Sequence, residues 1–203
     1  MARHAPYTVA PELERELVAH YSEPHRAYHN TTHIAELLQW FDVVADEVGW
    51  TNARDVYDAI LFHDVIYDPR AAHGDNERMS AALARRHGAS EHAAELILLT
   101  ARHGSIVREA VDADAAHFLD SDTAILGAEP AAFDAYDAAI AREYAHVPPD
   151  AFEAGRGAFL AKMLAQPRIF LSDFFHARLD ARARDNLGRA LARYQGQDGA
   201  TSS

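Results

Sequence analysis

The sequence predicts an all-α protein, a single domain built as a bundle of about eight helices. Apolar residues recur at steps of three and four along most of the chain, which is the spacing of one helix face. Glycine or proline follows most of these stretches and ends them. The alternation typical of β-strands is nearly absent. With 203 residues, 49% of them hydrophobic, the chain can form one sizeable core, and no internal repeat or long linker divides it.

The first half of the chain is predicted to contain four helices. The clearest has Ile34, Leu37, Leu38, Phe41, Val44 and Val48 on one face and ends at Gly49. Three more are predicted over residues 51–64, 75–87 and 90–103. Gly88 and Gly104 end the last two, because glycine readily adopts the backbone conformation that closes a helix.

The second half is predicted to contain four further helices. They span residues 112–126, 130–144, 150–165 and 172–194, each followed by glycine, proline or the tail. The first ten residues and the tail 195–203 show no periodicity, and we expect both to be frayed. The ordered core of the predicted domain 1–203 is therefore roughly residues 7–195.

Composition excludes several classes of function. Acidic residues outnumber basic ones by 31 to 19, giving a net charge of −12, which disfavours binding to polymeric nucleic acid. The chain has no cysteine, so disulfides, thiolate metal sites and thiol nucleophiles are absent, and histidine and carboxylate must hold any metal. No signal-like segment or long apolar run occurs, and we expect a cytoplasmic protein without a membrane partner.

Ionisable side chains fall on predicted apolar faces, where an unpaired charge is costly. His33 stands four residues before Leu37 and shares its buried stripe. His63 and Asp64 close the next predicted helix. Asp122 lies on the apolar face of a third, the helix predicted over residues 112–126. Taken singly, each of the four also fits a core residue whose hydrogen bonds are satisfied by backbone or arginine.

Asp122 is the inward-facing carboxylate of its predicted helix. It continues the three- and four-residue steps of Leu119 and Leu126, whereas Asp120 lies roughly 160° away. Burying an uncompensated carboxylate would cost several kcal/mol, against a total stability of about 5–15 kcal/mol. A divalent cation bound by two imidazoles and two carboxylates would remove this cost, and such donors suit Zn, Mn, Fe, Co or Ni.

The order His33, His63-Asp64, Asp122 on successive helices resembles the HD superfamily of metal-dependent phosphohydrolases. The likeness extends over roughly residues 7–195. It is densest in stretches that resemble a small bacterial branch of predicted HD phosphohydrolases, namely 24–34 (PHRAYHNTTHI), 62–68 (FHDVIYD) and 76–77. The resemblance implies an HD-type helical domain in which His33, His63, Asp64 and Asp122 hold one divalent transition metal per chain.

The activity implied by the resemblance is hydrolysis of a small phosphorylated metabolite, such as a nucleotide. A metal of this kind activates water for attack on phosphorus and offsets the charge that develops. Asp64 and Glu77 are the predicted catalytic residues. Glu77 fits an acid or base acting through water, and equally a charge favoured at the N-terminus of a helix. Neither the metal nor the choice between phosphomonoester and phosphodiester is fixed.

Four further residues are predicted to contact the substrate: Arg26, His29, His103 and Arg156. Phosphoryl transfer requires cations around the phosphate oxygens, and arginine supplies forked donors. Arg26 stands seven residues before His33, and Arg156 lies between two glycines. Both also fit structural ion pairs.

The two histidines have alternatives of their own. His29 lies outside the helix that carries His33 if Thr31 or Thr32 caps that helix. His103 follows Leu96 and Leu99 at steps of seven and four, so it fits a substrate contact, a ligand of a second metal or a hydrogen-bonded core histidine.

Two alternative functions stay open. A dinuclear iron oxygenase on the same scaffold would need His103 or a neighbouring histidine as a ligand, together with two irons per chain. A non-catalytic module that binds a metal or nucleotide and regulates a partner would need no turnover. The sequence does not fix the oligomeric state.

Overall fold

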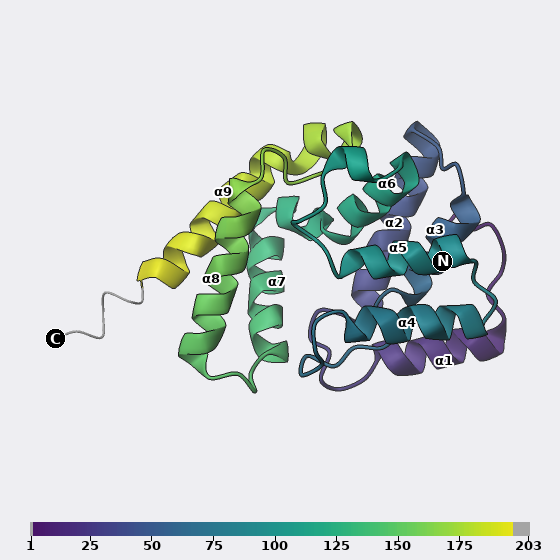
Figure 1. The fold of residues 1–203 in the computed structure, drawn as a ribbon, viewed down its shortest axis with the longest axis horizontal. Coiled ribbons are helices and arrows are strands. Elements are labelled where there is room, and N and C mark those ends of the chain that lie inside the picture. Colours follow the sequence, from purple (N-terminus) through teal and green to yellow (C-terminus); the bar gives the residue numbers. More distant parts are fainter. Residues whose placement is uncertain (1, 197–203) are drawn as a thin grey trace. The chain divides into compact units, whose positions relative to one another are not determined.

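The computed structural model describes residues 2–196, and all the regular secondary structure in this part of the chain is helical (Figure 1). It contains nine α-helices and two short 3₁₀-helices, with no strand in the described residues. The all-α prediction is therefore confirmed, with one α-helix more than predicted. The chain divides into two compact units, Met1–Asp122 and Thr123–Ser203, and each is described by itself. The predicted single domain stays a prediction.

The first unit is built around α3. Its elements are α1 (Pro11–Tyr21), α2 (Thr31–Glu47), α3 (Ala53–Phe62), α4 (Asp75–Arg86), α5 (Glu91–Thr100), η1 (Arg108–Ala110) and α6 (Ala113–Asp122). Helix α3 packs against α2, α4, α5 and α6, and every residue from Val56 to Phe62 is buried. The residues that follow α3 therefore emerge inside this unit.

Helix α1 is the element that the sequence pattern does not predict. Of its eleven residues only Leu17 and Tyr21 are buried, so it shows no repeated apolar stripe. Proline near its start and acidic side chains in its first turn favour the helix locally.

The N-terminal segment differs from the frayed end that the sequence predicts. The backbone N–H groups of Arg3 and His4 donate to the carboxylate of Asp42 at 2.7 and 2.8 Å. The hydroxyl of Tyr7 donates to Asp58, which is buried on α3. Polar contacts with α2 and α3 hold this segment in place, and they leave no trace in apolar periodicity.

The helix ends in the first unit largely follow the predicted stops. The side chain of Asn30, and not Thr31 or Thr32, caps α2 by accepting the N–H of Thr32 at 2.8 Å. Gly49 and Gly88 adopt positive φ angles of 88° and 86° after their helices. Helix α5 ends at Thr100, three residues earlier than predicted, so His103 lies in the turn that follows.

The second unit contains the remaining elements. These are η2 (Ala124–Gly127), α7 (Pro130–Glu143), α8 (Pro149–Ala165) and α9 (Asp173–Gly196). The long α9 packs along α8 and against η2, and the side-chain amide of Asn186 donates to the carbonyls of Leu126 and Ala128. The helix predicted over 112–126 is interrupted at Thr123, between α6 and η2. The predicted frayed tail lies, for 197–203, outside the described residues.

Candidate metal centre

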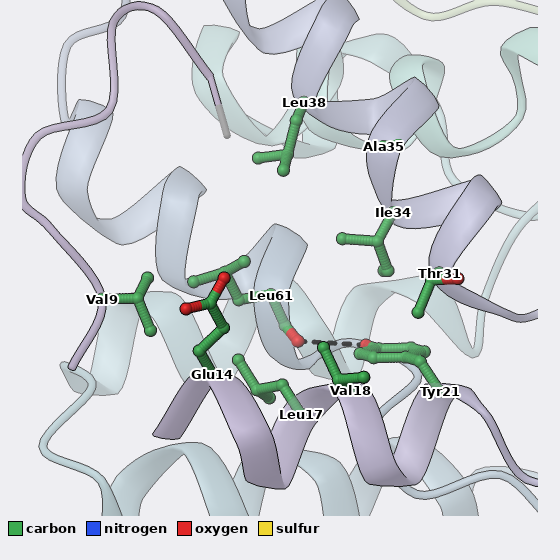
Figure 2. A pocket seen from close by; sticks show the side chains of 10 residues that line it. All are labelled: Val9, Glu14, Leu17, Val18, Tyr21, Thr31, Ile34, Ala35, Leu38 and Leu61. Carbon is green, nitrogen blue, oxygen red and sulfur yellow. Dashed lines mark hydrogen bonds between the residues drawn. The ribbon is translucent and has the colours of Figure 1, made fainter. Parts of the chain in front are cut away.

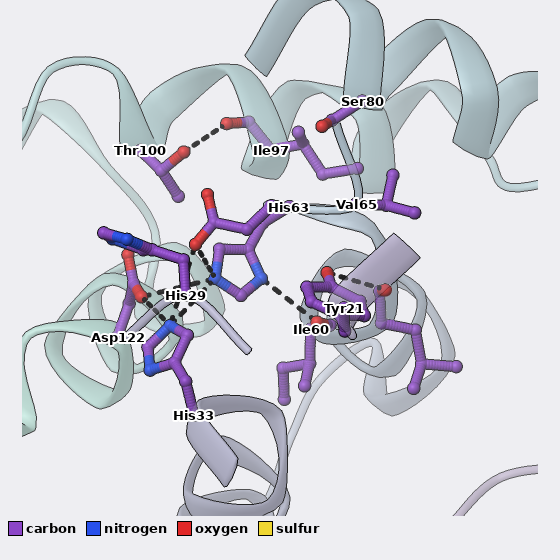
Figure 3. Close-up of polar contacts among 12 residues, drawn as sticks. Tyr21, His29, His33, Ile60, His63, Val65, Ser80, Ile97, Thr100 and Asp122 are labelled. Carbon is purple, nitrogen blue, oxygen red and sulfur yellow. Dashed lines mark hydrogen bonds and ion pairs between the residues drawn. The ribbon is translucent and has the colours of Figure 1, made fainter. Parts of the chain in front are cut away.

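His33, His63, Asp64 and Asp122 meet in the first unit, each at the end of a helix. His33 is in the first turn of α2, His63 and Asp64 follow α3 directly, and Asp122 is the last residue of α6. Figure 3 shows the side chains of His33, His63 and Asp122 turned toward one another. Three segments that are far apart in sequence thus contribute two imidazoles and two carboxylates to one place.

The donor atoms are close enough to share a cation. One ligand atom each from His33, His63 and Asp64 lies within 4.8 Å of the others, a grouping that could hold a metal ion. The Nε2 atoms of the two histidines are 3.2 Å apart, and Asp64 Oδ2 lies 3.2 Å from Nε2 of His63. Asp122 Oδ1 lies 3.0 Å from Nε2 of His33 and 3.4 Å from that of His63.

Hydrogen bonding orients the ring of His63 as a ligand. Its side chain is fully buried, and its Nδ1 lies 3.0 Å from the carbonyl oxygen of Ile60. Because a carbonyl only accepts, Nδ1 carries the proton and Nε2 turns a lone pair toward Asp64 and Asp122. A lone pair so close to two carboxylates is repelled unless a proton or metal ion lies between them.

The pKa shifts of His63, Asp64 and Asp122 also indicate that the cluster favours a positive charge. Burial would lower the pKa of His63, but Asp64 and Asp122 outweigh burial and raise it well above its usual range. Burial would raise the pKa of Asp64, yet His63 and His29 lower it. The pKa of Asp122 is likewise lowered by His63, His103 and His33 despite burial. The two carboxylates thus favour a positive charge at the cluster, and this donor set fits a divalent metal.

His103 binds the second oxygen of Asp122. Its Nε2 lies 2.7 Å from Oδ2, whereas Oδ1 faces the imidazoles of His33 and His63. The His103 side chain is partly exposed, whereas that of Asp122 is nearly buried. The sequence singles out His103 from its steps after Leu96 and Leu99, but it does not predict the bond to Asp122, since His103 lies in the turn after α5.

His29 lies beside the cluster, in the segment that precedes α2 (Figure 3). Its ring centroid is 5.9 Å from that of His33 and 4.4 Å from that of Tyr67. Tyr67 was not singled out from sequence, although it stands within the stretch 62–68 that carries the resemblance. The place of Tyr67 in this stretch is the sequence signal that could have identified it.

Arg26 is buried under the centre and bonded to backbone. Its guanidinium donates to the carbonyl oxygens of His29, Asp64 and Val65, and to the carboxylate of Glu23. The substrate contact predicted for Arg26 stays a prediction, and these partners give it a different setting.

Glu77 is not part of the cluster in the first unit, and Arg156 belongs to the second unit. Glu77 lies half-buried in the first turn of α4, and no hydrogen bond or ion pair joins it to the four candidate ligands in the described chain. Arg156 lies on α8 of the second unit, where its Nε donates to Asp137 at 2.9 Å. Its guanidinium also packs over the ring of Phe159. The roles predicted for both residues stay predictions.

An apolar pocket of about 180 Å³ lies beside the centre in the same unit (Figure 2). Its lining is Val9, Glu14, Leu17, Val18, Tyr21, Thr31, Ile34, Ala35, Leu38 and Leu61. The Tyr21 hydroxyl donates to the carbonyl of Leu61 at 3.0 Å, so that donor is already used. The lining has no cationic side chain and no candidate ligand, and it includes the acidic Glu14, so the pocket disfavours a phosphate.

No protein-family model, curated protein or solved structure matches the chain. Within residues 2–196, none of the helices combines the length and apolar character that crossing a bilayer requires. The candidate site therefore depends on its own geometry and on the sequence pattern.

Proposed function

We propose that this chain is a metal-dependent phosphohydrolase that acts on a small phosphorylated metabolite. The observation that carries the proposal is the convergence of His33, His63, Asp64 and Asp122, with the two Nε2 atoms 3.2 Å apart between carboxylate oxygens. The order of the same residues resembles the HD superfamily, in which they would hold the metal. A divalent ion bound there supplies a Lewis acid for a phosphate oxygen and lowers the pKa of water.

The residues around the centre have separate tasks in this proposal. The carboxylates of Asp64 and Asp122 would hold the metal, and without a cation to neutralise them they would repel an anionic phosphate. His29 lies half-buried beside the centre, and its imidazole can donate a hydrogen bond to a phosphate oxygen or a proton to a leaving group. His103 holds Asp122 Oδ2 and leaves Oδ1 directed at the imidazoles.

The experiment that tests the proposal compares the wild type with Asp64→Asn and a matched control. The control, Asp58→Asn, replaces another buried carboxylate of the first unit, one that is bonded to Tyr7 and not to the cluster. Metal content is measured by elemental analysis after incubation with Mn²⁺. Phosphate release is measured on a panel of nucleotides and sugar phosphates, and circular dichroism checks that each variant is folded.

We expect one metal per chain and metal-dependent phosphate release from the wild type and from Asp58→Asn. A folded Asp64→Asn should lose both, because the carboxylate next to His63 is removed. Phosphate release that persists in folded Asp64→Asn, or a wild type that binds no metal, would refute the proposal.

A dinuclear iron oxygenase is the second candidate function. The observation that favours it is the imidazole of His103, 2.7 Å from a carboxylate of the cluster. Two irons per chain, oxygen uptake and no phosphate release would establish this alternative. One bound metal with no turnover on any substrate would instead indicate a binding module.

A further inference from the structure

We propose that Arg26 is a positioning residue, whose guanidinium fixes the two backbone segments that carry the metal centre and makes no contact with the substrate. The inference rests on the proposed function, because it concerns the metal held by the cluster. It assigns to Arg26 a role different from that of a phosphate-binding cation.

The guanidinium joins two segments that are almost forty residues apart. Its Nη1 donates to the carbonyl of Asp64 at 2.7 Å and to that of His29 at 2.9 Å. Its Nη2 donates to the carbonyl of Val65 at 2.9 Å. One planar group thus sets the distance between the segment that carries His29 and leads to His33, and the segment that carries Asp64.

Burial separates Arg26 from any substrate. Its side chain has 0% exposure, and its guanidinium lies 5.2 Å from the ring centroid of Tyr21 and 5.4 Å from that of Tyr67. The Nε–H donates to Glu23 at 3.0 Å. A phosphate could reach this guanidinium only by displacing a ring, the Glu23 carboxylate or a backbone carbonyl, and a displaced carbonyl would lose a buried hydrogen bond.

The bonding pattern requires arginine. A guanidinium offers five N–H donors in a rigid plane, which matches a carboxylate on one edge and carbonyls on the other. Lysine has only three donors, all on one nitrogen, so its ammonium cannot serve Glu23 and the three carbonyls together. The charge-conserving variant Arg26→Lys should therefore fail to hold the centre, although a mere requirement for positive charge would be met.

The chain contains a matched control in Arg184. Its Nε donates to a carboxylate, Asp180, at 2.8 Å, just as that of Arg26 donates to Glu23. Its other donors bind the carbonyls of Leu164, Gln166 and Pro167, at 3.2, 2.9 and 2.9 Å. Arg184 belongs to the second unit, and none of its partners is a candidate ligand. Arg184→Lys therefore removes an equivalent fork without touching the metal centre.

The test compares full-length wild type, Arg26→Lys and Arg184→Lys. Calorimetric titration gives the Kd for Mn²⁺, and urea unfolding gives the loss of stability. A second titration with inorganic phosphate at saturating Mn²⁺ reports on a substrate contact. Glu23→Gln is added because Glu23 is partly exposed, so we expect this variant to fold even if Arg26→Lys does not. It loosens the guanidinium by removing the carboxylate charge that faces Nε.

We expect Arg26→Lys to raise the Kd for Mn²⁺ on the order of 10–100-fold, the usual effect of removing a group that orients metal ligands. Glu23→Gln should raise it less, and Arg184→Lys should not change it although it also loses stability. The Kd for phosphate at saturating Mn²⁺ should stay unchanged in all three.

Two results would overturn the assignment of Arg26 alone. One is a wild-type Kd for Mn²⁺ in Glu23→Gln and in any folded Arg26→Lys. The other is an unchanged Kd for Mn²⁺ together with weaker phosphate binding, which would make Arg26 a substrate contact. A wild type that binds no Mn²⁺ would overturn the proposed function together with this inference.

Discussion

Asp122 shows how a single carboxylate can be divided between two tasks. Oδ1 lies within 3.4 Å of the Nε2 atoms of His33 and His63, while Oδ2 lies 2.7 Å from His103. A hydrogen bond to one oxygen fixes the rotation of the carboxylate and thereby the direction of the other. His103 therefore acts on the centre through Asp122.

His103→Ala should weaken metal binding without abolishing it. Removing the donor frees the carboxylate of Asp122 to rotate, and we expect the Kd for Mn²⁺ to rise on the order of 10-fold or more. The stoichiometry should remain one metal per chain. Calorimetric titration measures both quantities.

His92→Ala serves as the control for this variant. His92 also pairs with a carboxylate, Asp55, at 3.1 Å, is similarly exposed, and contacts no candidate ligand. Its removal should leave the Kd unchanged. A fall from two bound metals to one in His103→Ala would contradict the positioning role and make His103 a ligand of a second ion.

At the residue scale, the sequence predicts the clustered side chains better than it predicts the residues that position them. His33, His63 and Asp122 could be found because charge on an apolar helical face is a local and unusual pattern. The partners of Arg26 could not be found in this way, since it binds main-chain carbonyls that every residue has. Side-chain identity gives no information about which carbonyls come together.

At the scale of elements, the contact between η2 and α9 in the second unit allows no side chain at Gly127. A Cβ added there would lie 2.6 Å from Cβ of Leu179 and 2.9 Å from its carbonyl oxygen. These atoms belong to the body of α9, so the helix itself would have to move. Gly127→Ala should therefore lower the free energy of unfolding by about 1–3 kcal/mol, the usual cost of overpacking.

Gly188→Ala, on α9, should have the opposite effect on the free energy of unfolding. Apart from the adjoining backbone of α9 itself, nothing lies within 4 Å of a Cβ added at Gly188, and alanine is the better helix former by roughly 0.5–1 kcal/mol. Urea unfolding should place the two variants on opposite sides of the wild type. Equal stability of Gly127→Ala and wild type would contradict the close packing of η2 on α9.

Asp180 ties the connection between α8 and α9 to α9 itself. Burial would raise the pKa of Asp180, but the N–H of Ile169 and the side chains of Arg184 and His176 outweigh it and lower the pKa. The folded state therefore binds the proton less readily than the unfolded state. The stability that this charge contributes is present above the ordinary pKa of 3.8 and is lost as the pH falls through the lower, folded value.

Asp180→Asn should lower the free energy of unfolding by about 1–3 kcal/mol at neutral pH, the usual range for hydrogen bonds to a charged group. The difference from the wild type should shrink below about pH 4, where the unfolded carboxyl of the wild type also binds a proton. Urea unfolding at neutral and acidic pH measures it. A difference that stays constant down to about pH 3 would show that the charge contributes nothing.

The elements that escaped prediction share a physical reason. Helix α1 buries too few side chains to show a stripe, and its start is set by proline and acidic residues. The interruption at Thr123 lies inside a continuous apolar pattern, since α6 and η2 both bury apolar residues. Periodicity reports which side of a segment is buried, and it carries little information about a short break in the backbone.

At the scale of the whole molecule, the candidate metal centre and both tryptophans belong to the first unit. Trp40 and Trp50 are the two tryptophans of the sequence. The indole N–H of Trp50 donates to the carbonyl of Phe41 at 3.0 Å, and its ring stacks on that fully buried side chain. Tryptophan emission therefore reports on the unit that is proposed to bind metal, while circular dichroism reports on helices of both units.

Bound metal should stabilise the first unit, on which tryptophan emission reports. An ion that binds only the folded state adds about 2.7 kcal/mol when its free concentration is 100 times Kd. In urea unfolding followed by the tryptophan emission maximum, saturating Mn²⁺ should thus move the wild-type midpoint to higher urea, and a chelator should reverse the shift. Asp122→Asn should show no shift, because its carboxylate no longer faces His33 and His63. Equal shifts in the two proteins would place the bound ion away from the cluster, and no shift in the wild type would exclude binding to the folded first unit.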